Sequence, residues 1–568
     1  MTWGQRRAII VIVLILAVVA FFWFVGSIGR TARVASNSVL VMDASGAIEE
    51  QRAPDFASAF SGEKTPVLHD YLDGLDEARR DARITGVVVR IGPLETGWAK
   101  LEEIRAHLLE FRKSGKPSVC YLGYDGIGNL EYYLASACSQ TWLLPTAPVN
   151  IHGMMAEAVF VRGTLDKLKI VPEFYHIAEY KTASNMFMEK KFTPPHKEEV
   201  ETLLRGVYAQ YIKDVSEARN IPRAKFEDLV NRGPLSSNEA VAGKLVDRLA
   251  YWDQVQDYFK TRKDGWNPVS LSRYRANSSA VPAFGGERIA VVEATGLIIS
   301  GASEETPGGG TVMGGDSVAA DLRRAREDSS IKAIVLRIDS GGGSAVASEV
   351  IRREVQLAKG EKPVVVSMSD VAASGGYWIA MDASKIVADP NTITASIGVL
   401  IGKFNVSGLF GMLGVSTDSV ATSDNASIFS SQSNFTPAQR ENIQRSLNET
   451  YANFTKGVAA GRHMQVDAVD KIGKGRVWLA SQAKDLGLVD ELGGLDRAIE
   501  VAKQLAHIPA SQSVRIVRLP EEKTFFQLLF ERQREPLSDS RSIEVLLRHL
   551  VRTMEPVQAR VPFDLIIR

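Results

Sequence analysis

The stretch Ile84–Ile91, ITGVVVRI, returns later in the chain as Ile331–Ile338, IKAIVLRI. Further matches follow in the same order, at offsets between 243 and 250 residues. Because a repeat this long indicates duplicated domains, the sequence predicts two related units in tandem. The other matched pairs are Val39–Gly46 with Ile289–Gly296, Gly115–Val119 with Gly360–Val364, Tyr132–Ala135 with Tyr377–Ala380, and Phe192–Pro194 with Phe435–Pro437.

Apolar, β-branched runs alternate with amphipathic helical patterns in both units. In the second unit the predicted strands are Ile289–Val292, Ala333–Ile338 and Pro363–Met368, and the predicted helices are Asp316–Ala325 and Ala345–Lys359. Strands that alternate with helices favour an α/β fold with a largely parallel sheet. The strands are mostly apolar rather than alternating, which is typical of a sheet covered on both faces.

The chain of 568 residues divides into four parts on these patterns. A tail without a counterpart in the first unit follows the second repeat, with helical patterns at Thr524–Glu531 and Ile543–Thr553. This tail could dock on the core, on a partner chain or on the membrane surface. A formal net charge of +0 gives no electrostatic sign of nucleic-acid binding. The predicted parts are 1–35, an anchor with its flank; 36–275, the first repeat; 276–508, the second repeat; and 509–568, the tail.

The N-terminal segment is apolar and uncharged from Ala8 to Gly26, with arginines on both sides. Its nineteen residues are long enough to cross a bilayer as a helix. We therefore expect a single transmembrane anchor, with signal-peptide cleavage near Ala32–Ser36 as the alternative. Long domains cross a membrane largely regardless of charge, so a cytoplasmic N-terminus with the bulk of the chain outside is weakly favoured.

The two cysteines, Cys120 and Cys138, both lie in the first repeat. We interpret them as small buried apolar residues, and a disulfide stays open if the domain faces an oxidising compartment. No paired C-x-x-C spacing is present, so no zinc site or other metal site is predicted. Nothing in the sequence indicates a cofactor.

Ser374 is the first candidate for chemistry. It follows a buried strand and a short turn, Asp370–Ala373, and precedes a helical pattern through Val387, SGGYWIAMDASKIV. A hydroxyl at the start of a helix lies near free backbone N–H groups, which favour a developing anion. The alternative is that Ser374 only caps the helix.

A glycine-rich loop, Asp339–Ser344 (DSGGGS), ends one strand and opens the next helix. Its approachable N–H groups suit an oxyanion hole. A phosphate-binding loop is the alternative, although neither G-x-x-x-x-G-K-[ST] nor G-x-G-x-x-G occurs here. The first repeat has Gly92–Glu95 (GPLE) at this place, so that copy lacks the loop as well as the serine.

The base that would activate the serine is not marked by a local motif. None of the eight histidines lies in a motif typical of a catalytic triad, and none lies between Ile289 and Arg462. A lysine is the other route, provided that burial lowers its pKa enough to leave it neutral. Lys181, in the first repeat among apolar residues, could be such a base or an ordinary surface lysine.

The two units are complementary on this interpretation. Aligned on the repeat, Ser374 falls opposite Asn129, and Lys181 falls opposite Asp424. Each copy has lost the part that the other keeps, so only the pair holds a nucleophile and a base.

Four segments together resemble the signal peptide peptidase A family in its long, duplicated, membrane-anchored form. They are Ser374–Trp378 (SGGYW), Thr394–Val399 (TASIGV), the Asp339–Ser344 loop and Tyr180–Ala183 (YKTA), and the resemblance spans roughly residues 36 to 505. One departure is Asp-Ser-Gly at 339–341, where the family usually has Asn-Ser-Pro. The two following glycines are kept.

The resemblance implies two tandem Clp-protease/crotonase-like domains and a serine endopeptidase without a cofactor. It implies Ser374 as the nucleophile, Lys181 as the general base and Ser396 as the residue that orients the lysine. The backbone N–H groups of Gly342 and Gly375 would form the oxyanion hole. Whether Lys181 reaches the serine of its own chain or of a neighbour stays open.

The resemblance also implies a homo-oligomer, with a tetramer favoured, on the outer, periplasmic side of the cytoplasmic membrane. Its substrates would be apolar peptides, above all signal peptides left after secretion. Two alternatives remain: a crotonase-like acyl-transfer enzyme, and a non-catalytic membrane scaffold. The anchor argues against the first, and retention of Ser374 with Lys181 argues against the second.

Overall fold

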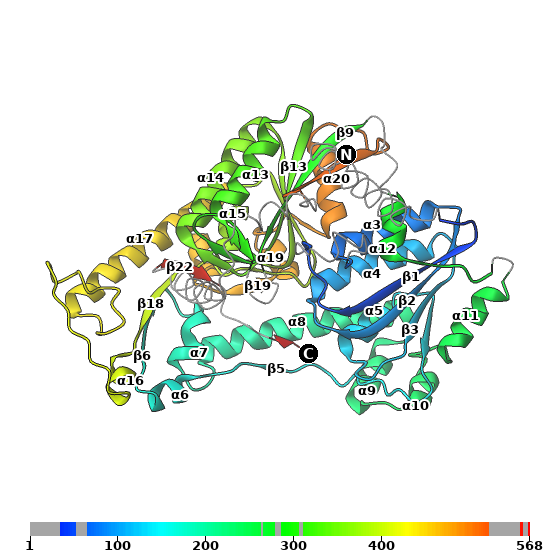
Figure 1. Cartoon of the computed structure of the whole chain (residues 1–568), viewed down its shortest axis with the longest axis horizontal. Helices are drawn as coiled ribbons and strands as arrows, with labels where there is room; N and C mark the ends of the chain where they lie inside the picture. Colours follow the sequence, from blue (N-terminus) through cyan, green and yellow to red (C-terminus); the bar gives the residue numbers. More distant parts are fainter. Residues whose placement is uncertain are drawn as a thin grey trace, which may run out of the picture.

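The computed structural model describes residues 34–52, 65–262, 265–278, 286–305, 311–521, 557–560 and 566–567 (Figure 1). Within these ranges no helix combines the length and the apolar character that a membrane crossing needs. The predicted anchor, Ala8–Gly26, lies outside the described residues, as do the two predicted tail helices.

Six strands form the sheet of the first unit, and all of its strand pairs are parallel. Helices α3, α4, α5 and α8 cover one face, and α11 covers the other. The expected parallel sheet with two covered faces is therefore confirmed. In spatial order the strands are β7 (Arg248–Leu249), β4 (Gln140–Leu143), β3 (Ser118–Leu122), β2 (Ile84–Leu94), β1 (Ser38–Gly46) and β8 (Pro268–Ser270).

The sheet of the second unit repeats this order and adds two strands: β17 pairs in parallel with β15, and β19 pairs antiparallel with β17 at the edge. Helices α13, α14 and α15 pack on one face and α20 on the other. The path is β19 (Val477–Leu479), β17 (Ile393–Ala395), β15 (Val364–Ala373), β13 (Ile331–Ser340), β9 (Glu287–Thr295) and β21 (Val514–Leu519), while β16 (Lys385–Ala388) pairs with β15 and with β20 (Glu491–Leu492).

Strand β21 corrects the interpretation of the tail. It pairs in parallel with β9, as β8 pairs in parallel with β1 in the first unit. The segment after residue 508 therefore begins with the counterpart of β8 and completes the second sheet. The match is hard to see in the sequence because β8 has only three residues.

A third sheet joins segments of both units. Its order is β11 (Glu304–Glu305), β12 (Thr311–Gly314), β10 (Leu297–Ile299), β14 (Gly342–Ser344), β22 (Val557–Arg560), β18 (Leu400–Asn405) and β6 (Val171–His176). Strand β6 comes from the first unit and pairs with β18 of the second along six residues. With α6 and α16, these two strands form an arm at the end of the molecule opposite α11 (Figure 1). A separate pair joins β5 (Ala156–Glu157) to β23 (Ile566–Ile567).

The helices follow the amphipathic patterns. The predicted helices Asp316–Ala325 and Ala345–Lys359 lie within α13 and α14. The helices are α3 (Leu68–Arg80), α4 (Trp98–Arg112), α5 (Asn129–Ala135), α6 (Arg162–Lys167), η1 (Thr182–Ser184), α7 (Asn185–Met188), α8 (Pro194–Arg219), α9 (Arg223–Arg232), α10 (Ser237–Ala242), α11 (Trp252–Lys260), α12 (Leu271–Ser278), α13 (Gly315–Glu327), α14 (Ala345–Glu361), α15 (Gly375–Ala380), α16 (Ser407–Met412), α17 (Pro437–Gly461), α18 (Val466–Ile472), α19 (Ala480–Asp485) and α20 (Leu495–Leu505).

Two local predictions around Ser374 are wrong. Asp370–Ala373 is the last part of strand β15 and not a turn, because it pairs with both β13 and β17. The helix that follows is also short. It ends at Ala380, and Lys385–Ala388 is a strand between β15 and β20.

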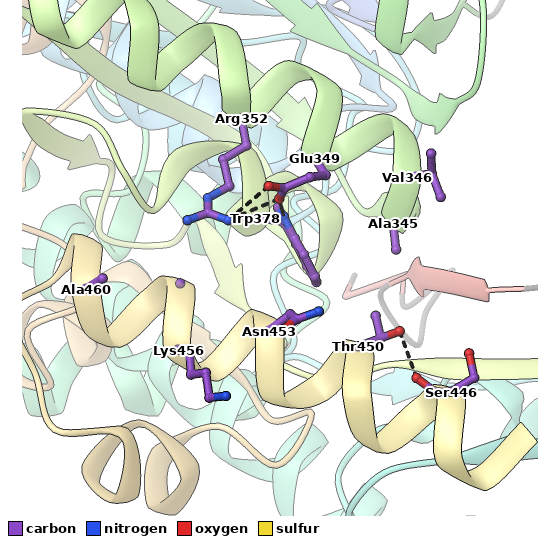
Figure 2. A pocket seen from close by; sticks show the side chains of 11 residues that line it. Ala345, Val346, Glu349, Arg352, Trp378, Ser446, Thr450, Asn453, Lys456 and Ala460 are labelled. Atoms are coloured by element: carbon purple, nitrogen blue, oxygen red, sulfur yellow. Dashed lines mark hydrogen bonds and ion pairs between the residues drawn. The ribbon is translucent and has the colours of Figure 1, made fainter.

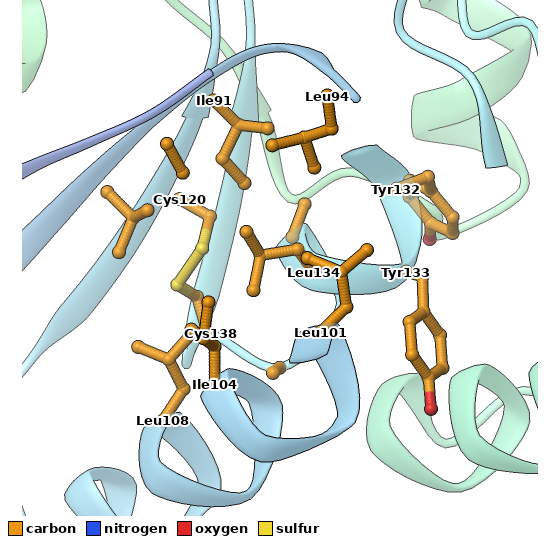
Figure 3. Packing of buried hydrophobic residues seen from close by; sticks show 14 of the residues in the cluster. Ile91, Leu94, Leu101, Ile104, Leu108, Cys120, Tyr132, Tyr133, Leu134 and Cys138 are labelled. Carbon is orange, nitrogen blue, oxygen red and sulfur yellow. A yellow bond between two sulfur atoms is a disulfide. The ribbon is translucent and has the colours of Figure 1, made fainter. Parts of the chain in front are cut away.

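The core of the first unit contains both cysteines. Figure 3 shows them among buried residues of β3, α4 and α5. Cys120 and Cys138 form a disulfide, with their Cα atoms 5.6 Å apart. The interpretation as two small apolar residues is therefore right about their burial, and the structure pairs them.

Buried ion pairs hold the two units together. Arg337 of the second unit is almost fully buried and contacts Glu50 at 2.7 Å and also Glu103, both from the first unit. Lys100 of the first unit contacts Asp339 of the second at 2.8 Å. Charges buried this deeply are retained only when they are paired, so these contacts require the units to dock in one arrangement.

We expect Arg337→Ala to destabilise the protein strongly, because it leaves Glu50 and Glu103 buried without their cation. Breaking a buried pair costs about 3–5 kcal/mol. Thermal and urea unfolding would measure the loss. Arg497→Ala is the matched control, since Arg497 makes more exposed pairs with Glu491 and Glu500 and should change stability by under ~1 kcal/mol. Equal stability of the two variants would show that the buried pairs do not hold the units together.

Candidate active site

Ser374 lies between the end of β15 and the start of α15, in a strained backbone conformation. Its φ of 56° and ψ of −112° are unfavourable for a residue with a side chain. Its N–H donates to the carbonyl oxygen of Ala395 at 2.6 Å, which ties it to strand β17. The side chain makes no capping hydrogen bond. Ser374 thus occupies the N-cap position of α15, but its hydroxyl does not cap the helix and is directed elsewhere.

Lys181 comes from the first unit and reaches the serine of its own chain. It follows β6 and directly precedes the short helix η1. Its Nζ lies 2.7 Å from Ser374 Oγ, 3.1 Å from Ser396 Oγ and 3.3 Å from the carbonyl oxygen of Ser396. The structure thus brings together the three predicted catalytic side chains within one chain.

The hydrogen bonds around Lys181 suit a neutral amine. Ser396 Oγ donates to the carbonyl oxygen of Gly475 at 3.2 Å, so it accepts a hydrogen bond from Lys181. The Ser396 carbonyl oxygen accepts a second one. A neutral amine has two N–H bonds and one lone pair. With both N–H bonds directed at Ser396, the lone pair is left for the Ser374 hydroxyl.

Burial sets the charge state of the lysine. The Lys181 side chain is fully buried, and this desolvation lowers its pKa to about 7, against a smaller opposing effect of the nearby Glu199 carboxyl group. No ion pair to Lys181 occurs in the described part of the chain. A substantial fraction of the amine is therefore unprotonated at neutral pH, as a general base requires.

The proposed oxyanion glycines lie in close contact with each other. A Cβ atom on Gly375 would come within 3.1 Å of Gly342 Cα and of Gly343 N, so a side chain there would force the two loops apart. In this structure the N–H of Gly342 donates to Ser340 Oγ at 3.1 Å. The Gly342 N–H would have to give up its hydrogen bond to Ser340 before it could donate to an oxyanion.

Strand β22, near the C-terminus, lies beside this site. It runs antiparallel to β14, with Arg560 opposite Gly342, and antiparallel to β18, with Val557 opposite Ile401. It also contacts α14 and α15. Part of the tail thus docks on the core, in a groove between the glycine loop and β18.

A pocket of about 670 Å³ opens next to this strand, between α14, α15 and α17 (Figure 2). Trp378 and Glu349 lie on its wall, joined by a 2.7 Å hydrogen bond from the indole N–H to the carboxylate. Ala345 and Val346 line it on the side of β14.

The corresponding place in the first unit is filled by its own side chains. Asn129, opposite Ser374, donates to the carbonyl oxygen of Gly153 at 2.8 Å. The Glu131 carboxylate accepts the backbone N–H groups of Leu94 at 2.7 Å and of Gly128 at 2.8 Å. Asp424, opposite Lys181, is exposed on the surface. The first copy therefore keeps the fold and lacks the serine, and it contributes the lysine.

Two residues around Lys181 carry no recognisable signal in the sequence. Glu199 is fully buried one residue after the exposed Glu198, in a charged stretch that gives no sign of burial. Gly475 has a φ of 81°, and a Cβ atom there would collide with the backbone of Lys181. Glu199 is far in sequence from Ser374, and Gly475 is far from Lys181. Only the tertiary structure therefore reveals that they belong to the site.

Curated relatives that match this chain over most of its length are described as proteases. The chain is 34% identical over 540 residues to a chloroplastic serine protease SPPA of Arabidopsis thaliana, covering 93% of this chain and 78% of that protein. It is 34% identical over 523 residues to Protease 4 of Salmonella typhi, covering 88% and 83%. A shorter match, 34% over 186 residues, covers 32% of this chain and 54% of an Enterococcus faecium protein whose description contains "signal peptide peptidase SppA".

Among solved structures, a mutant of the membrane-bound stomatin-specific protease 1510-N in complex with a substrate peptide covers 44% of this chain and all of its own, at 16% identity and a TM-score of 0.27. That score is too low to support a conclusion. The sequence evidence is stronger: a family model described as peptidase family S49 matches residues 110–264 and 356–509, one stretch in each repeat. With these two matches and relatives aligned over most of its length, the chain belongs to peptidase family S49 and is a serine endopeptidase.

Proposed function

We propose that Ser374 and Lys181 form the catalytic dyad of this peptidase and that its substrates are extended apolar peptides, above all signal peptides left after secretion. The observation that carries the dyad is the 2.7 Å contact between Lys181 Nζ and Ser374 Oγ in a fully buried site. The substrate class is supported by the E. faecium relative and by the resemblance of the sequence motifs to the signal peptide peptidase A family.

The proposed reaction begins when Lys181 Nζ takes the proton of Ser374 Oγ. The oxygen attacks the carbonyl carbon of the scissile peptide bond, and the N–H groups of Gly342 and Gly375 stabilise the oxyanion. The protonated lysine then gives its proton to the leaving amine, and the C–N bond breaks. A water molecule, deprotonated in turn by Lys181, attacks the carbonyl carbon of the acyl-enzyme; the ester C–O bond breaks, the acid product leaves, and Lys181 returns the proton to Ser374 Oγ. Ser396 holds the amine in position throughout.

Strand β22 supports the proposal that peptides bind in extended form. The groove between β14 and β18 accepts this segment with main-chain pairing on both sides. Addition of a strand to an open sheet edge is a common way to bind peptides, since backbone hydrogen bonds supply affinity and neighbouring pockets supply specificity. We further propose that the pocket at Trp378 takes a side chain of the bound peptide.

The setting of the enzyme is also part of the proposal. We propose that Ala8–Gly26 anchors the chain in the cytoplasmic membrane, with both Clp-protease/crotonase-like domains on the periplasmic side. The Cys120–Cys138 disulfide supports an oxidising compartment. We further propose a homo-oligomer, which the exposed apolar side chains of Leu413, Val420 and Phe429 support; the resemblance to the signal peptide peptidase A family favours a tetramer.

Removing either member of the dyad should abolish peptide cleavage. We expect Ser374→Ala and Lys181→Ala, as full-length protein in detergent, to lose at least about 10³-fold in kcat/KM on apolar fluorogenic peptides. Lys113→Ala and Ser419→Ala are the matched controls, since both residues are exposed on the surface. A Lys181→Ala variant that stays active would place the base elsewhere. A wild-type protein inert on a broad peptide panel would favour the scaffold alternative.

The pH dependence should report the lysine. A general base works in its neutral form, so kcat/KM should rise with pH through a midpoint near the Lys181 pKa of about 7. Below that midpoint the rate should fall about tenfold per pH unit. Lys181→Arg should be inactive at every pH from about 5 to 9, because a guanidinium stays protonated. An acid limb centred near the carboxyl range, about pH 4–5, would instead indicate a carboxylate base.

Removing the C-terminal strand should favour peptide binding. A tethered segment competes at an effective concentration in the millimolar range. We expect a chain that stops at residue 556 to show a KM lowered several-fold with kcat nearly unchanged. The full-length double variant Gln558→Pro, Ala559→Pro should behave the same way, because proline cannot donate to the strand pairing. An unchanged KM in both variants would show that β22 does not occupy the substrate groove.

A further inference from the structure

Glu199 is a buried carboxyl group that the proposed mechanism does not use. It lies in the second turn of α8 and has no exposed surface. Carboxyl groups are almost never fully buried unless they are paired or hydrogen-bonded. Its partners therefore show what the protein gains from placing it there.

The carboxyl group of Glu199 links the two halves of the site. One oxygen accepts the backbone N–H of Val477 at 2.7 Å, and the other accepts the hydroxyl of Thr182 at 3.4 Å. Thr182 directly follows Lys181. Val477 begins β19, where it lies opposite Ala395, the residue before Ser396. Glu199 thus touches the neighbour of the base on one side and the strand that supports Ser396 on the other.

We propose that Glu199 is a positioning residue of the dyad, which fastens the Lys181 segment to strand β19 and governs how firmly the lysine holds its proton. This inference rests on the proposed function, because it concerns the base of that dyad. The hydrogen bond from the Val477 N–H supports the positioning role of Glu199. The charge of its carboxyl group near Lys181 supports the electrostatic role.

The charged groups that face Glu199 are Lys181 and Arg476, and His176 faces the lysine from β6. Burial raises the pKa of Glu199 to about 8, and the Val477 N–H, Arg476 and Lys181 partly oppose this rise. The pKa of Lys181 falls to about 7. Two groups with such close values share a proton near neutral pH and titrate as a pair.

The sign of the effect follows from the two ways to place that proton. When Glu199 holds it, Lys181 is neutral and can act as the base. When Lys181 holds it, the carboxylate stabilises the ammonium group and the base is blocked. Removing the carboxylate charge while keeping the hydrogen-bond acceptor should therefore leave more of the lysine neutral near neutral pH.

The test compares Glu199→Gln and Glu199→Ala with the control Glu201→Gln, a more exposed carboxylate on the same helix. Full-length protein in detergent is assayed for kcat and KM across the neutral range. Glu199→Gln should keep the acid limb of kcat/KM at the wild-type position, because Glu199 is itself protonated there, and should be more active than the wild type only near neutral pH, where Glu199 begins to ionise. Glu199→Ala, with no acceptor for Val477, should lose about tenfold or more in kcat at unchanged KM. Glu201→Gln should match the wild type.

A second readout keeps the test independent of peptide cleavage. In the Ser374→Ala background, competitive labelling of Lys181 with acetic anhydride, followed by mass spectrometry, gives the pH midpoint of its amine. Glu199→Gln should move that midpoint downward even if no peptide substrate is cleaved. An unchanged midpoint in Glu199→Gln would overturn the electrostatic role. A wild-type kcat in Glu199→Ala, or a Glu199→Gln variant as impaired as Glu199→Ala, would overturn the positioning role. Activity that survives Lys181→Ala would refute the dyad itself.

Discussion

The burial of a single amine, that of Lys181, is the constraint on which the rest of the site depends. An amine with no anion bonded to it is tolerated in the interior only when it can give up its proton and use its remaining hydrogen-bonding groups. Both conditions hold here, because Ser396 accepts two hydrogen bonds from the amine and Ser374 Oγ lies 2.7 Å from its nitrogen. Since the lysine belongs to one unit and both serines to the other, this environment exists only when the units are docked.

The docking surface therefore supports catalysis as well as stability. Lys100 of the first unit lies 2.8 Å from Asp339, at the start of the glycine loop, and 3.5 Å from Asp370, four residues before Ser374. Asp370 also accepts the backbone N–H groups of Gly97 and Lys100, each at 3.1 Å. Residues of the first unit thus hold both the glycine loop, Asp339–Ser344, and the end of strand β15, which leads to Ser374. The first unit contributes one residue to the dyad, yet it supports the frame around the other.

The sequence predicts a structural feature well when the residues that determine the feature are close together in the chain. The repeat, the parallel sheets and the helices follow from periodicity, and the segments around Ser374, Ser396 and Lys181 carry motifs that are specific in combination. The helix predicted after Ser374 is too long because the apolar residues of β16 fit a helical pattern as well as a strand. Glu199 and Gly475 could not be found at all. Their roles come from contacts with segments some eighteen to three hundred residues away, and a charged helix face or a loop glycine looks ordinary in sequence.

The two copies differ in their hydrogen bonds as well as in the catalytic residues that each has lost. In the first unit, the backbone N–H groups of Leu94 and Gly128 are taken by the carboxylate of Glu131, so a negative charge already occupies part of the region where a substrate oxyanion would form. The Asn129 side chain is buried, and its amide donates a hydrogen bond to the carbonyl oxygen of Gly153. A serine at position 129 would therefore have the Glu131 carboxylate close by, and the residue opposite Lys181 in the repeat, Asp424, supplies no amine. The first copy has been rebuilt as a support, and this explains why one chain with two similar domains holds one dyad in its described residues.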